Sequence, residues 1–217
     1  MNLTQPLPRR IGLMADSHDQ LEALRGAIRA LKNRGVSSLI HLGDICDSLR
    51  PDLLEDSIHL LQKNNIFAIK GNNDFTLEKT LQTHRGETSK GLAEHIAFLQ
   101  ALPLKIAWDG ICFCHALPFD HHRAIYEPVD MGSNERAEDI FNFTSHRILF
   151  CGHSHRSVLF RWNRGKTERE TIPMDNPTRL DPGDRYIFVA GSVIEGECAI
   201  FDTKEWSLRR IPLTPSG

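Results

Sequence analysis

The sequence predicts an α/β fold in which two mixed β-sheets face each other and helices flank them, an αββα sandwich. Two observations favour it: strands alternate with helices in the N-terminal half, and closely spaced strands fill the C-terminal third. A plain doubly wound sheet is the competing architecture. The chain has 217 residues, 40% of them hydrophobic, and is expected to form a single domain over residues 1–217.

Three strand-then-helix units open the chain. Their strands are predicted from apolar runs at residues 10–15, 38–42 and 66–70. Helical periodicity follows each run, at residues 21–35, 51–63 and 75–102. Such alternation predicts parallel strands that are joined by right-handed crossovers.

Antiparallel strands are predicted for the rest of the chain. Asp109 and Gly110 suit a two-residue hairpin turn with positive φ between strands at 104–108 and 111–114. An irregular loop at 118–132 and a short helix at 135–143 lead to a strand at 147–151. The remaining predicted strands are residues 157–162, 168–172, 186–190, 197–202 and 206–211.

Composition excludes several classes of protein. The net charge of −2 gives no global basic field, so no stable nucleic-acid complex is expected. No segment approaches the roughly 18 consecutive apolar residues of a membrane span, and residues 1–10 lack the apolar region of a secretory signal. The five cysteines show no Cys-x-x-Cys spacing, which indicates reduced, buried thiols. We expect a cytoplasmic protein without membrane contact.

Polar clusters follow the predicted strands at five places. They are Asp16-Ser17-His18, Gly43-Asp44, Gly71-Asn72-Asn73-Asp74, His115 and Gly152-His153-Ser154-His155. Each alone could be a helix cap, a turn or an ordinary strand-end histidine. Together they are expected to meet in one pocket, because the ends of successive strands lie side by side at the carboxyl edge of a sheet.

The side chains in these clusters indicate a metal site. Asp, His and Asn suit Mn²⁺, Fe, Zn²⁺ or similar first-row ions better than a thiolate site or an all-oxygen Ca²⁺ site. Seven candidate ligands are too many for one ion, but two ions that share a carboxylate can use them. The candidates are Asp16, His18, Asp44, Asn72, His115, His153 and His155.

These motifs, in this order, resemble the calcineurin-like metallophosphoesterases, especially their small bacterial and archaeal phosphodiesterase branch. The resemblance implies that Asp16, His18 and His155 hold one metal, that Asn72, His115 and His153 hold the other, and that Asp44 bridges them. It further implies hydrolysis of a phosphodiester by direct attack of a metal-bridging hydroxide. Mn is the favoured metal, with Fe, Zn, Ni or Co as others, and the substrate is expected to be a small phosphoester or nucleotide-like molecule.

One residue departs from the family pattern. Many members have a histidine after the ligand Asn, where it protonates the leaving oxygen, but this chain has Asn73. An amide cannot serve as a general acid at neutral pH. Asn73, Asp74 and His121 are the candidate catalytic residues. His121, His122 or Arg123 could supply the missing proton or bind phosphate, or could belong to a solvent-exposed loop.

Three other functions stay open at this point. Within the enzymes, a phosphomonoesterase or a dinucleotide polyphosphate hydrolase would use the same ligands. Outside them, a protein-binding scaffold could share the fold, although seven ligand-competent positions favour an enzyme. The physiological substrate and the oligomeric state, monomer or small homo-oligomer, are left open by the sequence.

Overall fold

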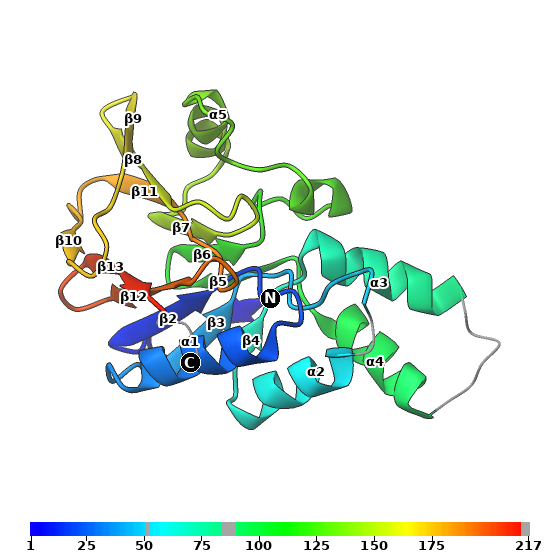
Figure 1. The fold of residues 1–217 in the computed structure, drawn as a ribbon. Coiled ribbons are helices and arrows are strands. Elements are labelled where there is room, and N and C mark those ends of the chain that lie inside the picture. Colours follow the sequence, from blue (N-terminus) through cyan, green and yellow to red (C-terminus); the bar gives the residue numbers. More distant parts are fainter. Residues whose placement is uncertain (51–52, 84–89, 214–217) are drawn as a thin grey trace.

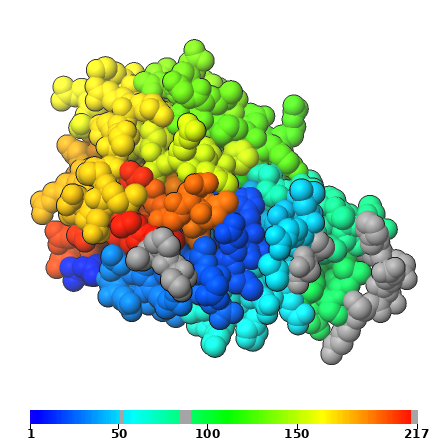
Figure 2. All heavy atoms as spheres, viewed as in Figure 1, coloured from blue at the N-terminus to red at the C-terminus, as the bar shows by residue number. Residues whose placement is uncertain are grey.

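The computed structural model describes residues 1–50, 53–83 and 90–213. Two mixed β-sheets lie face to face, with α1 to α4 on the outer side of one sheet and α5 on the outer side of the other (Figure 1). The predicted αββα arrangement is therefore confirmed, and the doubly wound alternative is wrong. Figure 2 shows the same division on the surface, with the green and yellow middle of the chain above the blue and cyan N-terminal part.

One sheet has seven strands in the order β1-β5-β6-β7-β11-β8-β9. Its strands are β1 (Asn2–Leu3), β5 (Lys105–Trp108), β6 (Ile111–Cys114), β7 (Ile148–Cys151), β8 (Val158–Asn163), β9 (Lys166–Glu170) and β11 (Arg185–Val189). β5 and β6 form the predicted hairpin, with φ of 48° at Asp109 and 77° at Gly110. β6 and β7 run parallel, so the residues that follow them leave the sheet at the same edge.

The other sheet has six strands in the order β10-β13-β12-β2-β3-β4. Its strands are β2 (Arg10–Met14), β3 (Ser38–His41), β4 (Phe67–Ala68), β10 (Thr178–Arg179), β12 (Glu197–Asp202) and β13 (Ser207–Pro212). β2, β3 and β4 are parallel, as the three opening units predict. β12 then pairs antiparallel with β2 and makes the sheet mixed.

The helices agree with the sequence except around residues 72–102. They are α1 (Leu21–Lys32), α2 (Leu54–Lys63), α3 (Asn72–Thr83), α4 (Lys90–Ala101) and α5 (Glu135–Phe143), with a 3-10 turn η2 (His122–Ile125). The single helical stretch predicted at 75–102 is two helices, and α3 starts earlier, inside the polar cluster at 71–74. Part of the polar segment 82–90, and residues 51–52 of the predicted second helix, lie outside the described residues.

Aromatic side chains fill the space between the sheets. Phe150 of β7 is fully buried, and its ring centroid lies 5.4 Å from that of Phe113, 5.3 Å from Phe201 and 6.3 Å from Phe188. Phe201 belongs to the six-stranded sheet, and the other three rings belong to the seven-stranded one. This packing fixes the distance between the sheets and therefore between the loops at their ends.

The sequence also predicts buried cysteines and no membrane-spanning segment. All five cysteines are free and buried, as predicted. Among the helices of the described residues, none is both long enough and apolar enough to cross a membrane. The single-domain assignment and a cytoplasmic location stay predictions.

Replacing Phe150 with Ala is expected to lower the free energy of unfolding by about 3–5 kcal/mol, because it leaves a cavity between the sheets. Phe143→Ala is the matched control, since Phe143 is 76% exposed and its loss should change stability by less than about 0.5 kcal/mol. Urea unfolding of the two variants measures both values. Equal losses would show that Phe150 does not hold the sheets together.

Candidate metal centre

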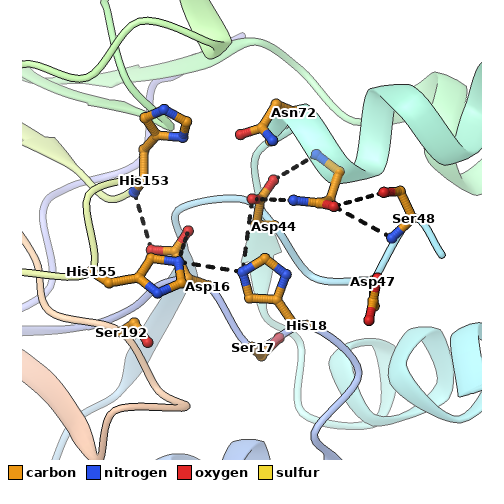
Figure 3. A network of polar contacts seen from close by, with 12 residues as sticks. Asp16, Ser17, His18, Asp44, Asp47, Ser48, Asn72, His153, His155 and Ser192 are labelled. Atoms are coloured by element: carbon orange, nitrogen blue, oxygen red, sulfur yellow. Dashed lines mark hydrogen bonds and ion pairs between the residues drawn. The ribbon is translucent and has the colours of Figure 1, made fainter. Parts of the chain in front are cut away.

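The five polar clusters meet in one place, at the carboxyl ends of the strands. Their loops are joined by backbone hydrogen bonds, from the Asp16 N–H to the Gly43 carbonyl (3.0 Å) and from the Gly152 N–H to the His115 carbonyl (2.9 Å). In Figure 3 the side chains of Asp16, His18, Asp44, Asn72, His153 and His155 surround one common space. The fold thus brings together residues that are up to 139 positions apart in the chain, from Asp16 to His155 (155 − 16 = 139).

Asp16, His18 and His155 form the first group of donors. His18 Nε2 lies 3.4 Å from His155 Nε2, and His155 Nε2 lies 3.7 Å from Asp16 Oδ1. All three ligand atoms are within 4.8 Å of one another. This spacing lets all three donors reach a single cation.

Asp44, His115 and His153 form the second group, again with ligand atoms within 4.8 Å of one another. His115 Nε2 lies 3.1 Å from His153 Nδ1 and 3.0 Å from the side-chain oxygen of Asn72. His115 Nδ1 faces the Leu42 carbonyl at 2.9 Å, which turns Nε2 toward the group.

Asp44 belongs to the second group and also faces the first. Its Oδ2 is 3.9 Å from His18 Nε2, and its Oδ1 is 3.5 Å from His115 Nε2. One carboxylate therefore presents one oxygen to each set of donors. Burial raises the pKa of Asp44, but His115 and the hydrogen bonds from Asn73 outweigh burial and bring the pKa below its usual range.

The donors fit a pair of cations. Oδ1 of Asp16 is buried and has no hydrogen-bond partner among the described residues, although buried carboxylate oxygens are normally paired. Burial raises the pKa of Asp16 to about 7 and lowers the pKa of His153 to about 4. The neutral imidazole of His153 offers a lone pair without a proton, whereas Asp16 would give up its proton when it binds a cation, as metal-binding carboxyls do.

Asn73 is held by hydrogen bonds to the candidate ligand Asp44. Its backbone N–H and its side-chain amide donate to the two oxygens of Asp44 at 2.8 and 2.7 Å. Its own side-chain oxygen accepts from the Ser48 hydroxyl at 2.8 Å. The sequence did not single out Ser48, because a contact between residues so far apart in the chain leaves no local pattern. Asn73 and Ser48 together hold the Asp44 carboxylate in place.

Asp74 joins two of the ligand loops. Its carboxylate accepts from the backbone N–H groups of Gly71 (2.8 Å), Asp44 (3.0 Å), Ile45 (3.0 Å) and Cys46 (3.2 Å). Burial, followed by the charge of Asp44, raises the pKa of Asp74 despite these donors. The contacts give Asp74 a positioning role, and a catalytic role for it stays a prediction.

Gly71 permits the close approach of the same two loops. A Cβ atom at this position would lie 2.1 Å from Oδ1 of Asp44 and 2.2 Å from the Asp44 backbone nitrogen. No side chain fits there without displacing the Asp44 carboxylate.

The ligand residues also have an unusual backbone. φ is positive at Asp16 (54°), His18 (43°), Asp44 (53°), His153 (74°) and His155 (57°). Left-handed conformations are uncommon for residues other than glycine, and they concentrate at functional sites.

The loop at 118–132 lies beside the centre. The ring of His122 stacks on Phe75 with centroids 4.4 Å apart, and the hydroxyl of Tyr126 lies 3.3 Å from that of Thr76. His121 is exposed and stacks on Phe119 at 6.0 Å, and Arg123 is exposed as well. Roles for His121, His122 and Arg123 in proton transfer or phosphate binding stay predictions.

Residues 10–204 match the family model of the calcineurin-like phosphoesterase superfamily domain. The chain belongs to the calcineurin-like phosphoesterase superfamily. This confirms the resemblance seen in the sequence motifs. An uncharacterized protein of Methanocaldococcus jannaschii is 26% identical over 220 aligned positions, which cover 91% of this chain and 84% of that protein.

Solved structures support the fold of this phosphoesterase. A metallophosphoesterase from Sphaerobacter thermophilus matches with a TM-score of 0.71 at 22% identity, covering 96% of this chain and 90% of the other. A protein described as a putative diadenosine tetraphosphatase matches with a TM-score of 0.60 at 16% identity, covering 99% of each chain.

Asp74→Asn is expected to destabilise the phosphoesterase by about 3 kcal/mol, because an amide NH₂ would face backbone N–H donors that need an acceptor. Asp56→Asn, at an exposed position in the first turn of α2, is the control and should lose at most about 1 kcal/mol, the contribution of its charge at the helix N-terminus. Guanidinium unfolding provides the comparison. If Asp74→Asn unfolds like the control, the carboxylate does not bind these loops together.

Proposed function

We propose that this protein is a binuclear metal-dependent phosphoesterase, with phosphodiesters as its favoured substrates. The observation that carries the proposal is the position of Asp44, whose two oxygens face two separate groups of donors. Asp16, His18 and His155 would hold one ion, and Asn72, His115 and His153 the other, with Asp44 shared. We favour Mn²⁺, with Fe, Zn, Ni or Co as alternatives.

When bound, two cations would supply Lewis acidity for a phosphoryl group and for an attacking water. The residues of this chain provide the setting for that chemistry. Leu42 orients His115, Asn73 and Ser48 fix Asp44, and the lowered pKa of His153 keeps its imidazole neutral at pH 7. Such preorganised donors need no rearrangement during the reaction.

The contacts of Asn73 bear on the choice of substrate. Its amide is engaged by Asp44 and Ser48, and an amide has no proton to give a leaving oxygen at neutral pH. A leaving group that departs as a stable anion needs no such proton. Aryl phosphodiesters and phosphoanhydrides both meet this condition, whereas alkyl esters do not.

A dinucleotide polyphosphate hydrolase is the second candidate, because its leaving group is itself a phosphate. One structural neighbour is named as a putative diadenosine tetraphosphatase, and another as an archaeal phosphodiesterase, with a TM-score of 0.50 at 18% identity over 94% of this chain and 99% of that chain. A phosphomonoesterase and a protein-binding scaffold are the remaining alternatives. A panel of aryl diesters, aryl monoesters and dinucleoside polyphosphates separates the enzymes from one another.

The metal content provides the main test. The wild type is expected to bind about two divalent ions per chain and to hydrolyse a bis-aryl phosphodiester. Asp44→Asn should bind less metal and lose about 10³-fold in kcat, because the shared ligand loses its charge. Asp139→Asn, on the exposed face of α5, should behave like the wild type. Elemental analysis and steady-state kinetics measure these outcomes.

A wild type that binds metal poorly and hydrolyses none of these substrates would favour the scaffold. One ion per chain with full activity would contradict the binuclear arrangement.

The leaving group provides a separate test of Asn73. We expect the rate to fall steeply as the pKa of the leaving group rises. Asn73→His should flatten this dependence and speed alkyl substrates relative to aryl ones by about 10²-fold or more, because it restores a proton donor. Asn73→Ala is the control and should slow all substrates to a similar extent. A flat dependence in the wild type, with chemistry rate-limiting, would contradict this role.

A further inference from the structure

A second pocket, of about 650 Å³, lies at the opposite end of the six-stranded sheet. It is lined by the starting residues of β2 and the ends of β12 and β10, together with residues after α1. In Figure 1 the labels of β10, β12 and β13 lie together at the left of the molecule. Arg10 opens β2, and this strand ends at Met14, two residues before Asp16, so the pocket is about 20 Å from the candidate metal centre.

The register of the strands explains which side chains line this pocket. On β12, Phe201 points into the core between the sheets, so its neighbours Ile200 and Asp202 point to the outer face. Ile200 pairs with Arg209 on β13, and Asp202 pairs with Arg10 on β2. Paired residues share a face of the sheet, so these side chains gather on the same outer surface.

Arginines dominate the lining. Five of them are present against two carboxylates, which leaves an excess of three positive charges in a chain of net charge −2. The arginines are Arg9, Arg10, Arg34, Arg179 and Arg209, and the carboxylates are Asp202 and Glu205.

The two carboxylates engage only some of the arginines. Asp202 accepts from Nε of Arg10 at 3.1 Å and lies 3.7 Å from Nε of Arg9, and Glu205 lies 3.6 Å from Arg179. Within the described residues, neither Arg209 nor Arg34 has a carboxylate partner, and the Arg34 guanidinium donates to the Ala30 carbonyl.

Hydrogen bonds hold one guanidinium group, that of Arg10, in a fixed position, whereas the side chains of Arg9 and Arg179 are 59% and 83% exposed. Arg10 donates to Asp202 and, at 2.8 Å, to the Arg34 carbonyl, so it links the end of α1 to the sheet. Arg34 and Arg10 therefore line the pocket together beside β2, and Arg179 lines it from β10, three strands away in the sheet. Guanidinium groups that converge on a concave space without enough carboxylates favour a ligand that brings its own negative charge.

We infer that this pocket binds a small molecule that carries two or more phosphoryl groups. Guanidinium forks match phosphate oxygens in pairs, and several arginines around one space suit more than one phosphate. The volume is that of a typical small-molecule site, and Ile200 and Pro177 add apolar surface beside the charges. A nucleic-acid strand fits less well, because it needs an extended basic surface that a chain of net charge −2 lacks.

Calorimetric titration of the full-length chain with inorganic pyrophosphate tests this inference. EDTA is present, so that no cation at the metal centre attracts the phosphates. We expect one pyrophosphate per chain with micromolar affinity. Arg209→Gln and Arg34→Gln should each weaken binding at least tenfold, and Arg209→Lys should weaken it less, since it keeps the charge but loses the fork.

Two control variants test whether the pyrophosphate binds at this pocket. Arg164→Gln, in the exposed turn between β8 and β9, should bind like the wild type and thus exclude a general charge effect. Asp44→Asn should also bind like the wild type, because the metal centre is not involved. Circular dichroism checks that each variant is folded.

Several results would overturn the inference. One is that the wild type does not bind pyrophosphate up to millimolar concentration, another that Arg164→Gln weakens binding as much as Arg209→Gln does, and a third that Asp44→Asn loses binding. Affinity for sulfate equal to that for pyrophosphate, or tighter binding of a single-stranded oligonucleotide than of pyrophosphate, would also contradict it. The metal-dependent hydrolysis proposed above is measured separately, so failure of one proposal leaves the other standing.

Discussion

The hydrogen bonds that Asp74 accepts are the constraint on which the metal centre depends. One buried carboxylate ties the loop after β3, through Asp44, to the start of α3, through Gly71. Three carboxylates are then buried close together, and each is compensated differently. Asp74 receives backbone N–H groups and Asp44 receives Asn73, whereas Asp16 has one backbone donor and an oxygen without a hydrogen-bond partner among the described residues. Asp16 is thus the carboxylate with the least hydrogen bonding, and it lies beside the histidines of the candidate site. A cation would be bound most strongly at this place.

The backbone at this centre also stores strain. Left-handed φ values at Asp16, Asp44 and His153 cost up to about 1–3 kcal/mol each when nothing relieves them. Hydrogen bonds between the loops oppose this cost, such as the one from the Ser17 N–H to the Asp44 carbonyl at 2.9 Å. The core of stacked phenylalanines keeps the two sheets at a fixed separation. The fold therefore fixes the geometry of the candidate ligands before any cation binds.

The sequence predicts the location of the centre because apolar runs identify the strands, and polar residues after a strand must lie at its exit. It predicts the details less well, for physical reasons. Gly71 to Asp74 has the composition of a turn, but Asp74 draws the segment into the first turn of α3. β1 and β10 have two residues each, too few for any periodicity. The bond between Ser48 and Asn73 depends on the relative position of two loops, which only the folded chain determines.

The same strand that leads into the metal centre begins at the arginine pocket. β2 starts at Arg10 and ends two residues before Asp16, so one strand connects a basic end to an acidic one. Charges about 20 Å apart along an extended strand are separated by more than the Debye length of about 8 Å at physiological salt, so direct electrostatic coupling between the two ends is weak. Any influence of an anion on the ligands would have to travel through the packing of β2. Ile11 and Leu13 are fully buried between the two sheets, and close packing of this kind transmits strain. A shift of β2 would move Asp16 relative to His153, which follows β7 of the other sheet, and would therefore change the hydrogen bond from the His153 N–H to the Asp16 carboxylate.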